Sequence, residues 1–247
     1  MTDDRRGRVE TGLKWVRVYL RGRLVASTRR PLLVWEVPYY PTYYVPLTDI
    51  RADLDPNGIT EHSPELGEAA GFDVAIAGVR AEGAALRYLD SPIAELKDAV
   101  RLDFDTFDWF EEDEPIAIHP RDPHHRVDIL AGSRNVRVEV DGVTVADSSA
   151  PRILFETGLP PRYYLPRTDV RMDLLTPSDT HTGCPYKGTA DYWNVHVGDT
   201  EHRDIVWGYL TPLPESQKVA GLVCFYNEKV DIYLDGELQD RPHTPFS

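Results

Sequence analysis

The sequence is dominated by an internal repeat, in which residues 16–54 recur without a gap as residues 136–174. The two segments are VRVYLRGRLVASTRRPLLVWEVPYYPTYYVPLTDIRADL and VRVEVDGVTVADSSAPRILFETGLPPRYYLPRTDVRMDL, and they are identical at 17 of 39 positions at a constant spacing of 120 residues. A period of this length is too long for a solenoid unit of roughly 20–50 residues. The repeat therefore predicts two similar small domains in tandem.

Weaker similarity extends the repeat towards the end of each copy, at a spacing of 121 residues. The aligned pairs are Pro64 and Pro185, Gly67 and Gly188, Ala69 and Ala190, Phe72 and Trp193, Tyr88 and Tyr209, and Phe104 and Phe225. The one-residue step is expected in a loop between Asn57 and Ser63, since loops accept insertions at low cost.

Short strands separated by turns account for most of the second copy. Residues 136–140 alternate apolar and polar side chains, and Asp141-Gly142 is a preferred hairpin dipeptide before a returning strand. Further strands are predicted at residues 143–145, 153–155, 192–197, 221–226 and 230–234. Only residues 93–100 have a helical pattern, enough for about two turns. The predicted fold is mainly β: two tandem copies of a small β-barrel-like or sandwich-like domain with few short helices.

The segment between the copies is acidic and then rich in proline. Residues 103–114 hold seven carboxylates and no basic residue, which is typical of a solvated face followed by a linker. The predicted organisation is a first repeat at residues 14–113, a linker at 114–129 and a second repeat at 130–240.

Composition limits the classes of function. Lys and Arg number 27 against 41 Asp and Glu, for a formal net charge of −14, whereas binding to a nucleic-acid backbone needs clustered basic residues. No apolar run approaches the roughly 20 residues of a membrane span, and the N-terminus lacks the apolar core of a secretory signal. Two cysteines, Cys184 and Cys224, exclude a disulfide framework. We expect a cytoplasmic protein that binds neither nucleic acid nor membrane.

The strongest local signal for chemistry is the pentapeptide Cys184-Pro-Tyr-Lys-Gly188. An ammonium near a thiol favours the thiolate, which is the reactive form, although a packed cysteine beside a solvated lysine is the plainer interpretation. The aligned turn of the first copy is Ser63-Pro-Glu-Leu-Gly67. The residues that shape the turn therefore occur twice, whereas Cys184 and Lys187 occur once. This asymmetry predicts an active or binding site in the second copy and a degenerate first copy.

Other candidates surround this motif. Glu156 and Arg171 recur as Glu36 and Arg51, and a buried carboxylate needs a partner, so a structural ion pair is one interpretation and a role in the site the other. Four aromatic residues are candidates for lining a ligand pocket, with core packing as the alternative: Tyr164, Tyr192, Trp207 and Tyr209. Trp207 and Tyr209 are two apart on a predicted strand, so their side chains are expected on one face.

No metal site or cofactor is predicted. His119, His124 and His125 have no cysteine or paired carboxylate at a suitable spacing, and His181 with Cys184 has no second ligand pair. Walker, G-x-S-x-G and H-E-x-x-H motifs are absent from the sequence, so no motif names a reaction or a cofactor.

The motif combination resembles the domain of unknown function 427 family, which is also labelled nucleotidyltransferase-like. The resemblance is carried by Tyr163-Tyr164-Leu-Pro166 with Asp169-Val170, Cys184-Pro-Tyr-Lys-Gly188 with Tyr192-Trp193, Trp207-x-Tyr209, and Ala220-Gly-Leu-Val-Cys-Phe225. It covers the whole second copy and is strong in the first copy through residue 54. It implies a compact, mostly β fold in a two-copy form.

Three hypotheses for function remain open at this point. The first is a nucleotide- or small-molecule-handling enzyme whose second repeat uses Cys184, Lys187, Glu156 and Arg171. The second is a non-catalytic ligand-binding or scaffolding protein. The third is a redox protein using Cys184 and Cys224, which requires both sulfurs within disulfide reach.

Overall fold

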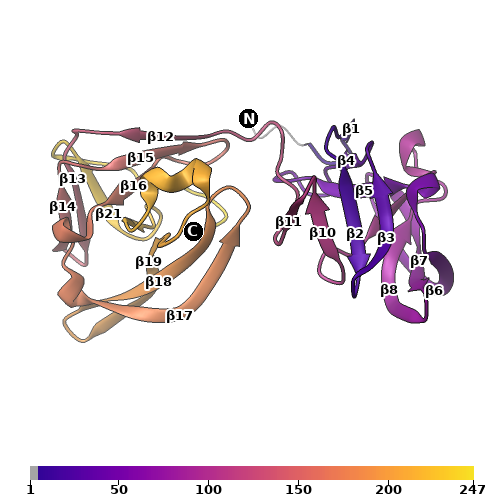
Figure 1. Ribbon diagram of the computed structural model, residues 1–247. Coiled ribbons are helices and arrows are strands. Elements are labelled where there is room, and N and C mark those ends of the chain that lie inside the picture. Colours follow the sequence, from indigo (N-terminus) through magenta and orange to yellow (C-terminus); the bar gives the residue numbers. More distant parts are fainter. Residues whose placement is uncertain (1–4) are drawn as a thin grey trace. The chain divides into compact units, whose positions relative to one another are not determined.

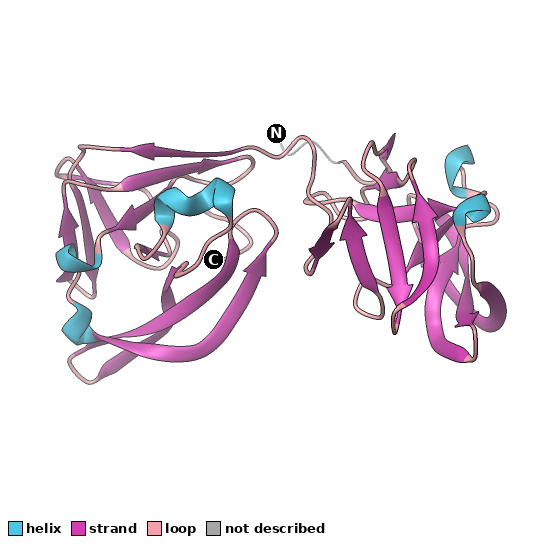
Figure 2. Ribbon diagram, viewed as in Figure 1, coloured by secondary structure: helices cyan, strands magenta, loops and turns pink. Residues whose placement is uncertain are grey.

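The computed structural model describes residues 5–247, which form two units; one ends at Asp122 and the other begins at Pro123. Each unit contains one seven-stranded and one four-stranded sheet, and neighbouring strands within every sheet are antiparallel (Figures 1 and 2). The predicted fold class, a mainly β, sandwich-like domain in two copies, is confirmed.

The first unit contains eleven of the strands of the described chain and two single-turn 3-10 helices. Its seven-stranded sheet has the order β1 (Val9–Thr11), β4 (Leu32–Val34), β5 (Thr42–Pro46), β9 (Ala99–Leu102), β8 (Val79–Arg87), β7 (Gly67–Ile76) and β6 (Asp53–Ser63). Its four-stranded sheet has the order β11 (Glu114–Ile116), β10 (Asp108–Glu111), β2 (Val16–Leu20) and β3 (Arg23–Thr28), and the 3-10 helices are η1 (Leu47–Asp49) and η2 (Ala94–Leu96).

The second unit repeats this topology strand for strand. Its larger sheet has the order β12 (Val127–Ala131), β15 (Arg152–Glu156), β16 (Arg162–Leu165), β20 (Val223–Phe225), β19 (Thr200–Gly208), β18 (Gly188–Val197) and β17 (Leu175–Cys184). Its smaller sheet has the order β14 (Val143–Ser148), β13 (Val136–Val140), β21 (Asp231–Leu234) and β22 (Glu237–Leu238), and the 3-10 helices are η3 (Arg167–Asp169), η4 (Met172–Leu174) and η5 (Pro214–Val219).

The first hairpin of the second unit is the one that the sequence predicts. Asp141 and Gly142 connect β13 to β14 with φ values of 49° and 77°. Two successive residues at positive φ are what a two-residue hairpin turn requires, and the aspartate–glycine pair adopts them readily. The turn therefore fixes the register of β13 and β14.

The two faces of the larger sheet in the second unit have different roles. One face packs against the smaller sheet and forms an apolar core that includes Val138, Val206, Phe225 and Ile232. The opposite face carries a second cluster, rich in tyrosine and tryptophan, to which Val219 of η5 belongs. The second face is therefore the part of the fold in which polar and aromatic side chains meet.

The helix predicted at residues 93–100 is wrong. Only the single turn η2 forms there, and the chain enters β9 at Ala99. Val100 and Leu102 are buried, and β9 pairs with β5 on one side and β8 on the other. Pairing with two strands outweighs a helical pattern only eight residues long.

The numerical offset between equivalent residues of the two copies changes at other positions than the comparison of the two sequence segments indicated. Residues 57–63 lie inside β6 rather than in a loop, and the extra residue of the second copy is taken up by η4. Further along, Leu102 pairs with Ala85 as Phe225 pairs with Val206. Leu102, not Phe104, is therefore equivalent to Phe225, and Arg101 takes the place of Cys224.

The predicted linker at residues 114–129 contains ordered strands. It includes β11, which pairs with β10, and the first residues of β12, which pairs with β15. Both strands lie at a sheet edge. β11 is only three residues long and β12 exposes Leu130 and Ala131, so neither shows the alternation of apolar and polar residues that marks a strand in a sequence. The acidic run likewise contains β10, whose Trp109 is buried.

Candidate functional site in the second unit

The second face of the larger sheet brings together side chains from six strands. Residues two apart on a strand point to the same face. The residues that share this face are Leu154 and Glu156 of β15, Arg162 and Tyr164 of β16, Ala190 and Tyr192 of β18, Trp207 of β19 with Tyr209 after it, Cys224 of β20 with Tyr226 after it, and Ile129 of β12. The prediction that Trp207 and Tyr209 lie on one face is confirmed.

A buried charge network lies at one end of this face, where Glu156 ends β15. Lys187 Nζ lies 2.7 Å from each oxygen of the Glu156 carboxylate, and both side chains are only 8% exposed. His125 Nε2 lies 3.0 Å from Glu156 Oε1, and the His125 ring stacks on Tyr186 at 4.4 Å between centroids. The carboxylate is therefore held by an ammonium and an imidazole at once.

The network keeps Glu156 ionised. Burial acts to raise the pKa of this carboxyl group, but the hydrogen bond from His125 and the charge and hydrogen bonds of Lys187 outweigh it, so the pKa lies below its ordinary value. A carboxylate buried to this extent is stable only when its oxygens are paired in this way.

The turn that carries Lys187 is built by the residues common to both copies. Cys184 and Gly188 face each other at the end of the β17–β18 hairpin, and the Lys187 N–H donates to the Cys184 carbonyl at 3.3 Å. Gly188 has a φ of 97°, as Gly67 has 96° in the first unit, a conformation that other residues rarely adopt. Ser216 of η5 donates to the Tyr186 carbonyl at 2.9 Å, so the turn is anchored on both sides.

Tyrosine hydroxyls continue the polar surface next to this turn. Thr182 Oγ1 and Tyr192 OH lie 2.9 Å apart, and Tyr192 OH lies 3.4 Å from Tyr226 OH. Burial, followed by the electrostatic effect of Cys184 and Glu156, raises the pKa of Tyr209 far above its ordinary value. Tyr209 is therefore a protonated hydroxyl that can only donate or accept a hydrogen bond.

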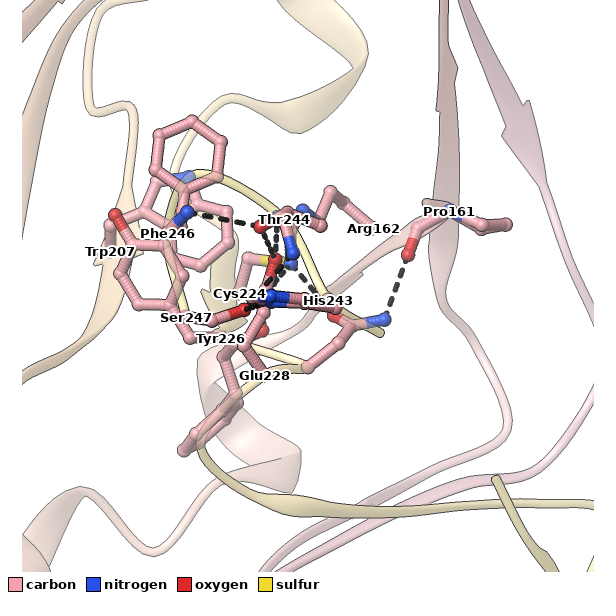
Figure 3. A network of polar contacts seen from close by, with 12 residues as sticks. Pro161, Arg162, Trp207, Cys224, Tyr226, Glu228, His243, Thr244, Phe246 and Ser247 are labelled. Carbon is pink, nitrogen blue, oxygen red and sulfur yellow. Dashed lines mark hydrogen bonds and ion pairs between the residues drawn. The ribbon is translucent and has the colours of Figure 1, made fainter. Parts of the chain in front are cut away.

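A second buried ion pair, which no sequence motif indicates, lies on the same face (Figure 3). Arg162 Nη1 and Nη2 each donate to Glu228 at 2.7 Å, and the two side chains are 5% and 0% exposed. Thr244 Oγ1 donates to Glu228 Oε1 at 2.5 Å, and the Arg162 guanidinium lies 5.5 Å from the centre of the Trp207 ring. Arg162 and Glu228 are 66 residues apart, and neither belongs to a motif that would link them.

The structure brings together most of the residues singled out in the sequence. Lys187 and Glu156 are in direct contact, and Trp207 Nε1 donates to Tyr164 OH at 3.2 Å. Arg171 is elsewhere: it is exposed and forms two hydrogen bonds with Asp173. The suggested ion pair between Glu156 and Arg171 is therefore wrong, because the turn of the next hairpin supplies the cation instead.

The two cysteines occupy different environments, and both are free thiols. Cys184 is half-buried at the hairpin end, whereas Cys224 is fully buried in β20. Burial raises the pKa of Cys224 to about 12, so this thiol stays protonated at neutral pH. The structure therefore shows no disulfide that would support the hypothesis of a Cys184–Cys224 redox pair.

The first unit keeps the carboxylate of this network but pairs it differently. Arg101 Nη1 donates to Glu36 Oε2 at 3.2 Å, and Tyr44 OH donates to Glu36 Oε1 at 3.0 Å. Leu66, which is fully buried, stands where the second unit has Lys187. The cation that pairs with the glutamate therefore comes from different elements in the two copies. In the first unit it is Arg101 of β9, and in the second unit it is Lys187 of the hairpin turn, while Cys224 of β20 takes the position of Arg101.

No group of three or more His, Cys, Asp or Glu side chains able to hold a metal ion occurs among residues 5–247. Of the histidines predicted not to bind metal, His125 contacts Glu156, and His119 stacks on Tyr40 at 4.0 Å. In the same part of the chain, no helix is long and apolar enough to cross a membrane.

Both units share the sandwich topology and the turn around a glycine at positive φ. The protein is therefore a duplicated β domain, and its second copy has a buried face with polar side chains. Comparison with known families agrees: the profile described as "Domain of unknown function (DUF427)" matches residues 8–112 and 128–236. The chain therefore belongs to this family and carries two tandem copies of its domain. No curated protein matches the sequence.

Proposed function

We propose that the second unit is the catalytic unit of an enzyme that acts on a small molecule. Cys184 is its nucleophile, and the charge network of Glu156, Lys187 and His125 lies beside it. The backbone hydrogen bond from Lys187 to the Cys184 carbonyl places both residues in one tight turn. A half-buried thiol in a turn beside an ammonium and an imidazole is the kind of residue that nucleophilic catalysis uses.

The observation that carries this proposal is the difference between the two copies. Both fold the same hairpin turn around a glycine at positive φ, and both pair a glutamate at the equivalent position, where the Glu36 and Glu156 side chains are 22% and 8% exposed. A purely structural carboxylate is satisfied by Arg101 in the first unit. The second unit supplies its cation from the hairpin turn, as Lys187, and adds His125 and Cys184, which have no counterpart of the same type in the first unit.

The contacts favour an uncharged or weakly charged small molecule over a nucleotide. Phosphate groups are bound by cations with free donors, and Lys187 and Arg162 already donate to Glu156 and Glu228. Nucleotidyl transfer also relies on metal ions held by carboxylates. Arg171, which the sequence suggested as a ligand-binding residue, has no part in this proposal because it lies at the surface with Asp173.

In the proposed reaction the Cys184 thiolate adds to a carbonyl carbon of the substrate; the C–S bond forms as the C=O π bond breaks, and that electron pair moves to the carbonyl oxygen as an oxyanion. The hydroxyls of Tyr192 and Tyr209 are the donors that can stabilise negative charge on the substrate, and Trp207 and Tyr164 form the aromatic wall. Tyr209 suits this role because its raised pKa keeps the hydroxyl protonated. Fixed donors of this kind stabilise developing charge at no cost of reorganisation.

Thiol alkylation tests the proposal without knowledge of the substrate. The rate of alkylation of Cys184 by iodoacetamide is measured between about pH 6 and pH 9, with Cys224 as an unreactive internal control. We expect Cys184 to react faster than a model thiol near neutral pH, and the Lys187→Leu variant, which restores the residue of the first copy, to react more slowly. A Cys184 that reacts no faster than the model thiol contradicts the proposal.

The alternative is a non-catalytic ligand-binding protein. One observation favours it: in the first unit a cavity of about 390 Å³ is lined by Glu36, Arg101 and Tyr40, and no cysteine lines it. Under this alternative the Cys184→Ser variant, which again restores the first copy's residue, binds the same ligands as the unchanged protein. Loss of turnover with retained binding supports the enzyme instead.

A further inference from the structure

The first unit contains a further cavity besides the one next to Glu36. It measures about 670 Å³ and adjoins β2, β10 and the segment 115–117. Its lining is dominated by aromatic rings together with one guanidinium: Tyr19, Phe104, Phe107, Trp109, Phe110 and Arg17. A cavity of this size and composition is typical of sites for small organic ligands.

The aromatic rings are arranged in two pairs by the strand register. Tyr19 and Phe110 meet edge to face at 5.6 Å, where β2 pairs with β10. Phe104 and Trp109 stack at 5.5 Å with an angle of 13° between their planes. The rings are held by packing against one another, so they present fixed surfaces to a ligand.

Two hydrogen-bond donors among the lining residues are unsatisfied. The buried Nε of Arg17 and the buried Nε1 of Trp109 have no partner. Arg17 Nη2 donates to Asp113 Oδ1 at 2.8 Å. The Asp113 side chain is 91% exposed, so a ligand atom can take its place as the acceptor. Buried polar groups are normally paired, and unpaired ones in a cavity wall indicate a missing acceptor.

The fold does not require this aromatic lining. The register of β13 with β21 makes Glu139 equivalent to Tyr19, and Ile232 equivalent to Trp109. At the same spacing, Val230 stands for Phe107 and Asn227 for Phe104. The second unit keeps the arginine and one ring at this sheet, as Arg137 and Tyr233, with the guanidinium 3.9 Å from the ring centre. It builds the other four positions from aliphatic and polar side chains, so the fold does not require Tyr19, Phe104, Phe107 and Trp109 to be aromatic.

We propose that this cavity binds an uncharged, planar heteroaromatic compound that carries a hydrogen-bond acceptor. The rings supply stacking surfaces, and Arg17 and Trp109 supply donors. Asp105 and Asp108 also line the cavity and disfavour an anionic ligand. The first unit is then a binding unit in its own right, not a degenerate copy, and this inference does not depend on the catalytic role proposed for the second unit.

Fluorescence quenching tests the proposal with a defined probe. The full chain is titrated with 2-aminopurine riboside, a neutral fluorescent heteroaromatic, and with indole, quinoline and benzimidazole by ligand-observed NMR. We expect saturable binding of at least one of these. Phe110→Ala is expected to weaken it at least about tenfold, while Tyr233→Ala, at the equivalent position of the second unit, leaves it unchanged. Absence of saturable binding by all four compounds, or equal loss in both variants, overturns the proposal.

Trp109→Phe tests the donor role separately, because it keeps the ring and removes the N–H group. A several-fold weaker affinity supports Trp109 as a donor to the ligand, and an unchanged affinity overturns that assignment. Circular dichroism and the unfolding midpoint of each variant are measured first. If Phe110→Ala fails to fold, Tyr19→Glu, which installs the residue of the second copy at a half-buried position, takes its place with the same expected loss.

Discussion

Lys187 and Glu156 are joined by two hydrogen bonds of 2.7 Å each, in a site where neither side chain is more than 8% exposed. The first unit retains the equivalent carboxylate, Glu36, and neutralises it from another strand through Arg101. A cation at this carboxylate is therefore a requirement of the fold. Only in the second unit does the hairpin turn carry this cation, as Lys187, three residues after the thiol of Cys184.

Lys187→Leu is expected to destabilise the second unit by about 3–5 kcal/mol, because it leaves a buried carboxylate without its main counterion. The double variant Lys187→Leu with Glu156→Leu is expected to recover most of that loss. Urea unfolding of the full chain measures the change, and hydrogen exchange at β15 and β18 assigns it to the second unit. Arg171→Leu is the control, since it breaks an exposed ion pair and is expected to change nothing measurable.

Acid is expected to weaken the second unit through Glu156. Its pKa is lower in the folded protein than the ordinary value of 4.5, so its contribution to stability is complete above about pH 4.5. The contribution is then lost as the pH falls through the lower folded value. Thermal unfolding between about pH 6 and pH 3 measures this, and Glu156→Gln is expected to flatten the decline. The exposed Glu237→Gln serves as control; an equal flattening there contradicts the assignment.

The arrangement of the second unit, in which the hairpin turn supplies the cation, can be built into the first unit. Arg101→Cys is expected to destabilise it by about 1–2 kcal/mol, because the partly exposed Glu36 then keeps only its hydrogen bond from Tyr44. Adding Leu66→Lys places an ammonium where the second unit has Lys187, and is expected to restore part of the loss. A double-mutant cycle of unfolding free energies measures the coupling. Simple additivity of the two losses would show that the turn of the first unit cannot deliver a cation to Glu36.

The repeat predicted the architecture well because its signals are local. Asp141-Gly142 indicates a hairpin without reference to the rest of the chain, and the alternation of apolar and polar residues over a few positions indicates a strand. The same locality explains the failures. The helix expected at residues 93–100 gave way to a strand paired on both sides, and the true spacing at Arg101 and Cys224 became visible only from strand register.

The candidate site was predictable only in part. Lys187 was found because Leu66 replaces it in the other copy, and Glu156 because Glu36 repeats it. Their contact, and that of His125 with Glu156, bridges 31 residues and depends on how β15 lies beside the hairpin turn. Such long-range pairing follows from the order of strands in the sheet, which a single sequence does not specify.

The Arg162–Glu228 pair offers the sharpest test of how this face is held together. Thr244 donates a hydrogen bond of 2.5 Å to Glu228, and its neighbour Phe246 lies 6.0 Å from Tyr226 between ring centres. Thr244→Val keeps the shape and removes the donor, so we expect a loss of about 1 kcal/mol and faster hydrogen exchange near β16. Thr244→Ser keeps the donor and is expected to retain most of the stability. A loss in Thr244→Ser with none in Thr244→Val would mean that the threonine methyl group, not its hydroxyl, stabilises the ion pair.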